Sequence, residues 1–129
     1  PTTYTGSDRF TKGIYTLFNR LNESNPDIIV AEAGGDPIEA NVPTFLEDPA
    51  LMRSVRAFVV VAGDVMGMMG TVSYLKRYSI KPHIYLTDPK DRNAYATRER
   101  VQALLPGLPI FNALNSAEIH NVARQILRA

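Results

Sequence analysis

The stretch at residues 27–41 reads DIIVAEAGGDPIEAN and gives the first indication of a fold class. Its first five residues are rich in Ile, Val and Ala, a pattern typical of a strand buried on both faces in a parallel sheet. We expect this strand to end at the acid Glu32, before a turn that contains Gly34 and Gly35. Functional groups of parallel sheets gather at the carboxyl ends of their strands. Glu32 is therefore the first candidate functional residue.

Similar apolar runs further along the chain predict three more strands, at residues 57–63, 82–88 and 108–114. Apolar residues at helical spacing predict helices around these strands, at residues 7–23, 44–54 and 91–105, after residue 70 and from residue 115 onward. Asp48-Pro49 is a candidate break in the second helix, and Asn115-Ser-Ala-Glu118 has the form of a capping box. Strands that alternate with helices indicate parallel βαβ units with right-handed crossovers. The predicted fold class is α/β, a mostly parallel sheet of about four strands with helices on both faces, as in P-loop NTPase-like and Rossmann-like folds.

The composition is that of one globular domain. The chain has 129 residues, of which 45% are hydrophobic and 21% charged, which allows a core and excludes a disordered chain. Its net charge of +1 argues against a nucleic-acid partner, because binding to phosphate backbones needs an excess of basic residues. The longest apolar run, residues 57–62, is too short to cross a bilayer, and the first residues lack signal-peptide features. We expect a cytoplasmic protein with no membrane partner.

The residue types limit the chemistry further. The chain has no cysteine, which excludes disulfides, a thiol nucleophile and thiolate zinc sites. His83 and His120 are two lone histidines, so a histidine metal cluster is not expected. Neither a G-x-S-x-G nor an H-E-x-x-H motif occurs, which excludes the corresponding hydrolases and zinc enzymes. Magnesium held by oxygen ligands is the metal class that remains.

Two segments carry a resemblance to a known family. The first consists of Glu32, Ala33, Gly34, Gly35, Pro37, Glu39 and Asn41, with Asp36 as an insertion before the proline. It resembles the E-G-A-G-[SG]-P-x-E-x-N segment of cobyric acid synthases and the E-G-A-G-G segment of dethiobiotin synthetases. The second, VVVAGDVMGMMG, is similar to the family's next strand, which ends in an Asp followed by glycines. The resemblance implies a P-loop NTPase fold of the dethiobiotin synthetase type, which uses magnesium and ATP to activate a carboxylate.

The resemblance assigns roles to six residues. Glu32 is the expected magnesium ligand, held at the end of a strand. Gly34 and Gly35 are expected to let the backbone approach the phosphates without an intruding side chain. Asp64 is either a second acid beside Glu32 or the cap of the following helix. Two further residues complete the candidate nucleotide site, Gly67 after Asp64 and Asp88 at the end of the third strand, where the alternative role of Asp88 is a turn and helix cap.

One part of the family's site is not present in this sequence. A P-loop needs G-x-x-x-x-G-K-[ST], whose amides and lysine hold the phosphates, and no such run occurs. The chain therefore resembles only the second half of such a domain. Either the first half comes from a longer protein, or a partner chain supplies it, or the domain no longer hydrolyses ATP. In each case we expect no autonomous ATP hydrolysis.

Two other functions remain open. A non-catalytic regulatory or interaction domain would bury a free sheet edge against a partner or a second copy of the chain. An NAD(P)-binding domain would use residues 63–70, GDVMGMMG, as a glycine-rich turn between strand and helix. A basic group near one helix, Lys90, Arg92, Arg98 and Arg100, is interpreted as solvated surface in preference to a phosphate site.

Overall fold

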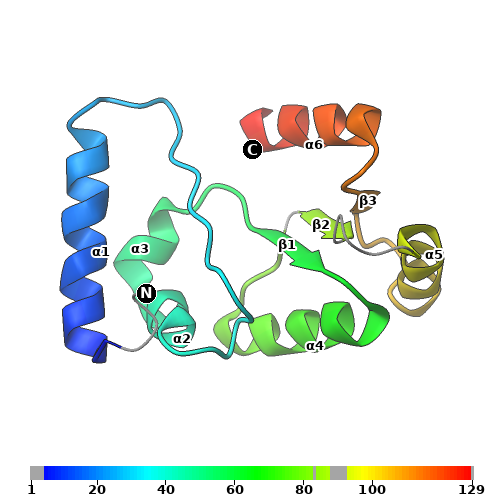
Figure 1. Cartoon of the computed structure of the whole chain (residues 1–129), viewed down its shortest axis with the longest axis horizontal. Helices are drawn as coiled ribbons and strands as arrows, with labels where there is room; N and C mark the ends of the chain where they lie inside the picture. Colours follow the sequence, from blue (N-terminus) through cyan, green and yellow to red (C-terminus); the bar gives the residue numbers. More distant parts are fainter. Residues whose placement is uncertain (1–4, 83, 88–92, 129) are drawn as a thin grey trace. The chain divides into compact units, whose positions relative to one another are not determined.

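The structure is a computed structural model that describes residues 5–82, 84–87 and 93–128. The chain divides into two compact units, Pro1–Ser54 and Val55–Ala129, which are called unit 1 and unit 2 below. Unit 1 is helical where it is regular, and unit 2 contains the sheet (Figure 1). Each unit is described by itself.

Unit 1 contains the helices α1 (Ser7–Asn22), α2 (Val42–Glu47) and α3 (Pro49–Ser54). The predicted helix at residues 44–54 is therefore present and is interrupted at Asp48, as the Asp-Pro pair indicates. The Asp48 carboxylate accepts hydrogen bonds from the amides of Ala50, at 2.9 Å, and Leu51, at 3.1 Å, and so caps α3. The hydroxyl of Tyr15 donates to the same carboxylate at 2.9–3.0 Å and connects α1 to this cap.

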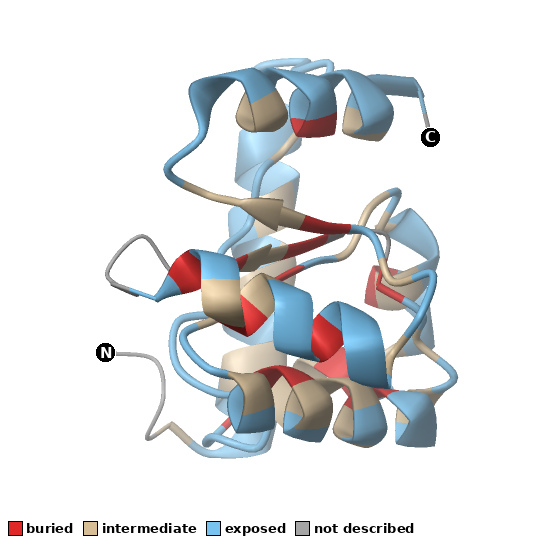
Figure 2. Ribbon diagram, turned by 90° about the vertical axis from the view of Figure 1, so that its right-hand side faces the viewer, coloured by how far each residue is buried: buried red, intermediate tan, exposed pale blue. Residues whose placement is uncertain are grey.

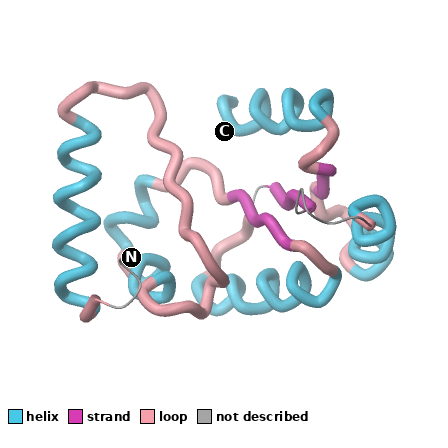
Figure 3. The backbone as a smooth tube through the Cα atoms, viewed as in Figure 1, coloured by secondary structure: helices cyan, strands magenta, loops and turns pink. Residues whose placement is uncertain are grey.

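The predicted strand at residues 27–31 is wrong. Residues 23–41 run without a helix or strand, as the loop trace between α1 and α2 shows (Figure 3). Ile28 is 44% exposed and Val30 is 91% exposed, so the apolar side chains that predicted a buried strand are not buried here. A strand exists only where a neighbour pairs with its backbone, and apolar pattern alone cannot supply that neighbour.

Unit 2 contains a parallel sheet of three strands in the order β1-β2-β3, instead of the four expected. The strands are β1 (Val59–Ala62), β2 (Ile84–Thr87) and β3 (Ile110–Asn112). These three strands lie within the strands predicted at residues 57–63, 82–88 and 108–114, respectively. In register, Ala62 pairs with Thr87 and Thr87 pairs with Asn112, so the carboxyl ends of the three strands lie at one edge.

The helices of unit 2 are α4 (Val65–Leu75), the 3-10 turn η2 (Lys76–Tyr78), α5 (Ala94–Leu104) and α6 (Ser116–Arg128). Both crossovers connect neighbouring strands in the same direction along the sheet, so α4 and α5 are expected on one face. In Figures 1 and 2, α6 lies on the opposite side of the strands from α4. The prediction of a parallel sheet flanked by helices is therefore confirmed.

The two faces of the sheet are buried to different extents. Register partners in a parallel sheet share a face, and successive residues alternate between faces. Val60, Tyr85 and Ile110 share one face and are 1–6% exposed, so this is the face covered by α4 and α5. Val59 and Val61 lie on the other face and are 36% and 55% exposed. On that face α6 contacts β3.

The predicted glycine-rich turn at residues 63–70 is also wrong for most of its length. Only Gly63 and Asp64 form the turn, and α4 begins at Val65 and includes Gly67 and Gly70. Glycine lowers helix propensity by about 1 kcal/mol relative to alanine, but packing of the segment offsets this cost at one methionine, whereas Met66 is 74% exposed. Met68, which is fully buried, anchors this turn of α4.

The predicted capping box at residues 115–118 is confirmed at the start of α6. The side-chain oxygen of Asn115 accepts hydrogen bonds from the amides of Ala117, at 3.1 Å, and Glu118, at 3.3 Å. The Glu118 carboxylate returns to the Asn115 side chain at 3.1 Å. Within the described residues, no helix is long and apolar enough to span a bilayer.

Candidate functional site

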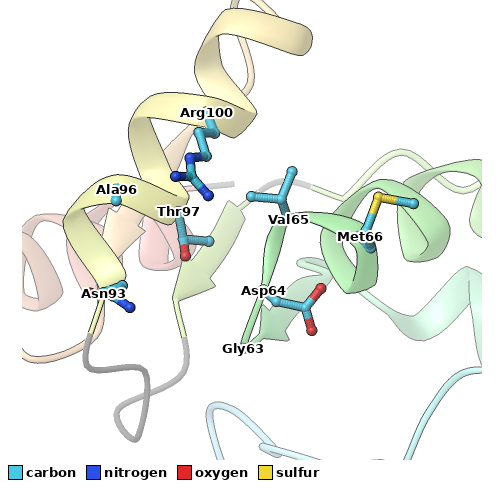
Figure 4. A pocket seen from close by; sticks show the side chains of 8 residues that line it. All are labelled: Gly63, Asp64, Val65, Met66, Asn93, Ala96, Thr97 and Arg100. Carbon is cyan, nitrogen blue, oxygen red and sulfur yellow. The ribbon is translucent and has the colours of Figure 1, made fainter.

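A pocket of about 460 Å³ opens at the carboxyl edge of the sheet in unit 2 (Figure 4). One wall consists of the turn after β1 and the first residues of α4, and the other wall is the amino-terminal half of α5. The lining residues are Gly63, Asp64, Val65 and Met66 on the first wall and Asn93, Ala96, Thr97 and Arg100 on the second. We call this the α4–α5 pocket. Its volume is within the range of small-ligand sites.

Asp64 shapes the first wall. It has an extended backbone at the N-cap of α4, and its Oδ1 accepts a hydrogen bond from the amide of Gly67 at 2.8 Å. Of the two roles that the sequence left open for Asp64, the helix cap is therefore present. Its carboxylate also lines the pocket, so it contributes a negative charge there. A side chain at Gly67 would meet this carboxylate at 3.5–3.7 Å, an ordinary contact, so close packing does not require glycine.

The second wall supplies a cation and polar groups. Arg100 is exposed on α5, and its guanidinium points into the space between the two walls in Figure 4. Thr97, one turn before Arg100, is 6% exposed. Asn93 is the N-cap residue of α5. The pocket therefore combines one carboxylate, one guanidinium, a hydroxyl and an amide, a set that can bind a polar ligand with negative charge near Arg100.

The basic group predicted near this helix separates into different roles. Arg98 forms an ion pair with Glu118 at 3.0 Å, whereas Arg100 lines the pocket. Lys90 and Arg92 lie outside the described residues. Helical geometry explains the separation, because residues two apart on a helix point to different sides. Asn93, Thr97 and Arg100 were not predicted as site residues, although an i, i+4, i+7 series of polar residues marks one side of a helix.

Glu32, Gly34 and Gly35 lie in the irregular part of unit 1 and are exposed. Glu32 does not end a strand. The strand predicted at residues 27–31, which would have brought Glu32 beside Asp64, is not part of the sheet. A Cβ at Gly35 would meet only the side chain of Glu39, whose flexible carboxylate can move aside. The φ of Gly35, however, is +100°, a conformation that residues with a side chain rarely adopt. The glycine is therefore required by the local turn.

That turn is organised by Asp36. Its Oδ1 accepts a hydrogen bond from the amide of Ile38 at 2.9 Å, and its carbonyl accepts one from the amide of Glu39 at 3.0 Å. An Asp side chain that bonds the backbone two residues later is a common turn device. Asp36, which is an insertion relative to the pattern of the resembled family, therefore stabilises this turn through its hydrogen bonds.

The amide of Gly67 donates to the Asp64 carboxylate in the first turn of α4, and of these two predicted site residues Asp64 lines the pocket and Gly67 does not. The remaining predicted residue, Asp88, lies outside the described residues. Among the residues that the structure describes, no group of three or more His, Asp or Glu side chains could hold a metal ion. Magnesium that arrives with a nucleotide commonly uses only one or two carboxylates and the phosphates themselves, so such a site would not form a group of this kind.

Comparisons with known proteins give no relative. No protein-family model matches the chain, and neither a curated protein nor a solved structure matches it.

Proposed function

We propose that the protein is a nucleotide-binding α/β domain and that the phosphates of its ligand lie in the α4–α5 pocket. The observation that carries this proposal is the position of Arg100 opposite the first turn of α4, at the carboxyl edge of a parallel sheet. Ligands of open α/β sheets bind at this edge. The amino end of α4 and the guanidinium both favour a negatively charged group.

The charge of the pocket favours a nucleotide with bound magnesium. The Asp64 carboxylate lines the same pocket and would repel a phosphate. A divalent cation between them reverses this repulsion, since oxygen ligands from a carboxylate and from phosphates suit magnesium. Magnesium and ATP are accordingly the proposed ligands, and Glu32 stays a proposed magnesium ligand on the strength of the sequence resemblance. We expect binding without autonomous hydrolysis, because the sequence has no P-loop.

Titration calorimetry with ATP and magnesium tests the proposal. We expect Arg100→Gln to weaken binding at least tenfold, because it removes a charge-assisted interaction. Arg124→Gln, which makes the same charge change at an exposed site on α6, is the matched control and should bind like the wild type. Glu32→Ala tests the magnesium ligand separately. Equal affinity of Arg100→Gln and the wild type, or no binding by the wild type, would reject the pocket as the site.

The magnesium dependence is a second readout. If Asp64 and the phosphates share a cation, ATP should bind at least tenfold more weakly in EDTA than with magnesium. Asp64→Asn should reduce this dependence, because it removes the repulsion while the amide oxygen can still cap α4. A nucleotide that binds equally well in EDTA would contradict the proposed role of magnesium.

An interaction domain is the second candidate function, and the exposed side of β1 favours it. β1 is an edge strand of the described sheet, and Val61 on its open face is 55% exposed. Exposed strand edges with apolar side chains are sites for partner chains. A self-associated chain in analytical ultracentrifugation, with no affinity for ATP, would favour this function. The NAD(P)-binding alternative has less support, since Gly67 and Gly70 lie within α4 and not in a turn.

A further inference from the structure

Thr87 is the last residue of β2, the central strand, and its side chain is fully buried. Among the described residues, its Oγ1 is the buried side-chain oxygen or nitrogen that has no hydrogen-bond partner. A buried hydroxyl without a partner destabilises the folded state, and native structures contain few of them. Such a group needs a physical explanation.

The position of Thr87 supplies a candidate explanation. Thr87 pairs in register with Ala62, and the next residue after Ala62, Gly63, lines the α4–α5 pocket. β2 also contacts α5, which forms the other wall. In Figure 4 the end of the β2 arrow lies between the labelled residues of the two walls. The carboxyl end of β2 therefore lies next to the two walls, although no residue of β2 lines the pocket in the ligand-free protein.

The side chain of Thr87 also points toward the side of the sheet that carries the pocket. Thr87 is two residues after Tyr85, so both side chains project from the same face. That face also carries Val60 and is the one covered by α4 and α5. The unpaired hydroxyl is thus directed to the side on which the two walls meet.

We propose that Thr87 is the innermost polar contact of the α4–α5 pocket and that it donates a hydrogen bond to a phosphate oxygen of the bound nucleotide. This inference rests on the proposed function. Ligand binding would provide the partner that the hydroxyl lacks in the ligand-free protein. Because the hydroxyl is covered in the ligand-free chain, the atoms that cover it must move when the ligand enters. Association is therefore expected to be slower than at an open site.

Two substitutions at Thr87 test the inference. Thr87→Val keeps the shape of the side chain and removes the hydroxyl, whereas Thr87→Ser keeps the hydroxyl. In calorimetric titrations with ATP and magnesium, we expect Thr87→Val to bind about tenfold more weakly than the wild type and Thr87→Ser to bind within about threefold of it. The ligand-free Thr87→Val protein should melt at or above the wild-type temperature, because it buries no unpaired oxygen.

A measurement on the wild-type chain covers the case in which a variant does not fold. The Cγ2 methyl resonance of Thr87 should shift on addition of ATP and magnesium, while that of Thr16, whose hydroxyl bonds the Lys12 carbonyl in α1, should not. Inorganic phosphate, used as a second probe, should move the same resonance if the phosphate group is the part that reaches Thr87.

The outcomes separate this inference from the proposed function. If Arg100→Gln weakens binding but Thr87→Val binds like the wild type, the role of Thr87 is wrong and the pocket stands. An unshifted Thr87 methyl resonance in a chain that binds ATP would also show that the role of Thr87 is wrong. If the wild type binds neither ATP nor phosphate, both proposals are wrong.

Discussion

Arg98 and Glu118 connect α5 to the start of α6. Nη1 of Arg98 donates to both carboxylate oxygens of Glu118, at 3.0 and 3.2 Å, and the two side chains are 29% and 23% exposed. The same carboxylate accepts a hydrogen bond from the amide of Asn112 at 2.8 Å. One side chain therefore joins α5, the end of β3 and the cap of α6.

Removal of this carboxylate should destabilise unit 2. Glu118→Ala loses the partner of the Asn112 amide, the cap of α6 and a partly exposed ion pair. We expect a loss of about 1–2 kcal/mol in the free energy of unfolding, measured in urea, because each net hydrogen bond contributes about 1 kcal/mol and such an ion pair less. Glu118→Gln should lose less. Glu99→Ala, at an exposed site on α5, is the control, and an equal effect of the two alanine variants would contradict this role.

The register of β1 predicts opposite results at two adjacent valines. Val60 is 6% exposed and Val61 is 55% exposed. Val60→Ala removes buried methyl groups and should cost about 2 kcal/mol in the free energy of unfolding. Val61→Ala should change it by less than about 0.5 kcal/mol. The reverse order in urea denaturation would mean that β1 turns its other face to the helices.

The two glycines of unit 1 should respond differently to substitution. Gly35 has a φ of +100°, whereas Gly34 has no atom within 4 Å of an added Cβ and is not among the described residues with positive φ. Gly35→Ala should lower the free energy of local unfolding of this turn by about 1 kcal/mol. This loss corresponds to hydrogen exchange of the Glu39 amide that is about fivefold faster. Gly34→Ala should leave this exchange unchanged. Equal exchange in both variants would show that the turn does not depend on the positive φ.

The cap of α3 predicts a loss of order at acid pH. Hydrogen bonds from the Leu51 amide, the Tyr15 hydroxyl and the Ala50 amide lower the pKa of Asp48 below its usual value of 3.8, although partial desolvation opposes this. A lowered pKa in the folded state means that the contribution of Asp48 to stability is present above pH 3.8 and is lost as the pH falls through the folded-state pKa.

Hydrogen exchange of the Leu51 amide measures this loss directly. In the wild type its protection should fall below pH 3.8. In Asp48→Asn the protection of the Leu51 amide should be lower than in the wild type already above pH 3.8, and it should not change further as the pH falls below 3.8. The hydrogen bond from the Tyr15 hydroxyl lowers the pKa of Asp48 and raises the pKa of the Tyr15 phenol. Because Tyr15→Phe removes this bond, the pKa of Asp48, and with it the acid transition of the Leu51 amide, should move toward higher pH. An unchanged transition in this variant would separate Tyr15 from the cap.

The features that the sequence predicted correctly depend on local signals. The break between α2 and α3 follows from an Asp-Pro pair, and the start of α6 follows from a capping box, each within four residues. The three strands β1, β2 and β3 are short apolar runs that have neighbours to pair with. An α/β class with a parallel sheet could therefore be predicted without the structure.

The features that were missed depend on contacts between distant residues. The apolar run at residues 27–31 has the composition of β1, but strand formation is decided by a pairing partner and not by composition. The segment at residues 63–70 looked like a turn because of its glycines, yet Met68 is buried where it continues as helix α4. Propensity is a weak signal, and tertiary packing overrides it at both places.

Local sequence signals were enough to predict the class of fold, the break before α3, the start of α6, and the presence of an acid, Asp64, at the end of a strand. The tertiary structure decided which residues share a pocket with that acid. Arg100 and Thr97 on α5 line the same pocket as Asp64. They come together because parallel pairing aligns the strand ends and right-handed crossovers place both helices on one face. No local pattern records these distances, since they are set by the pairing of segments that lie far apart in the chain.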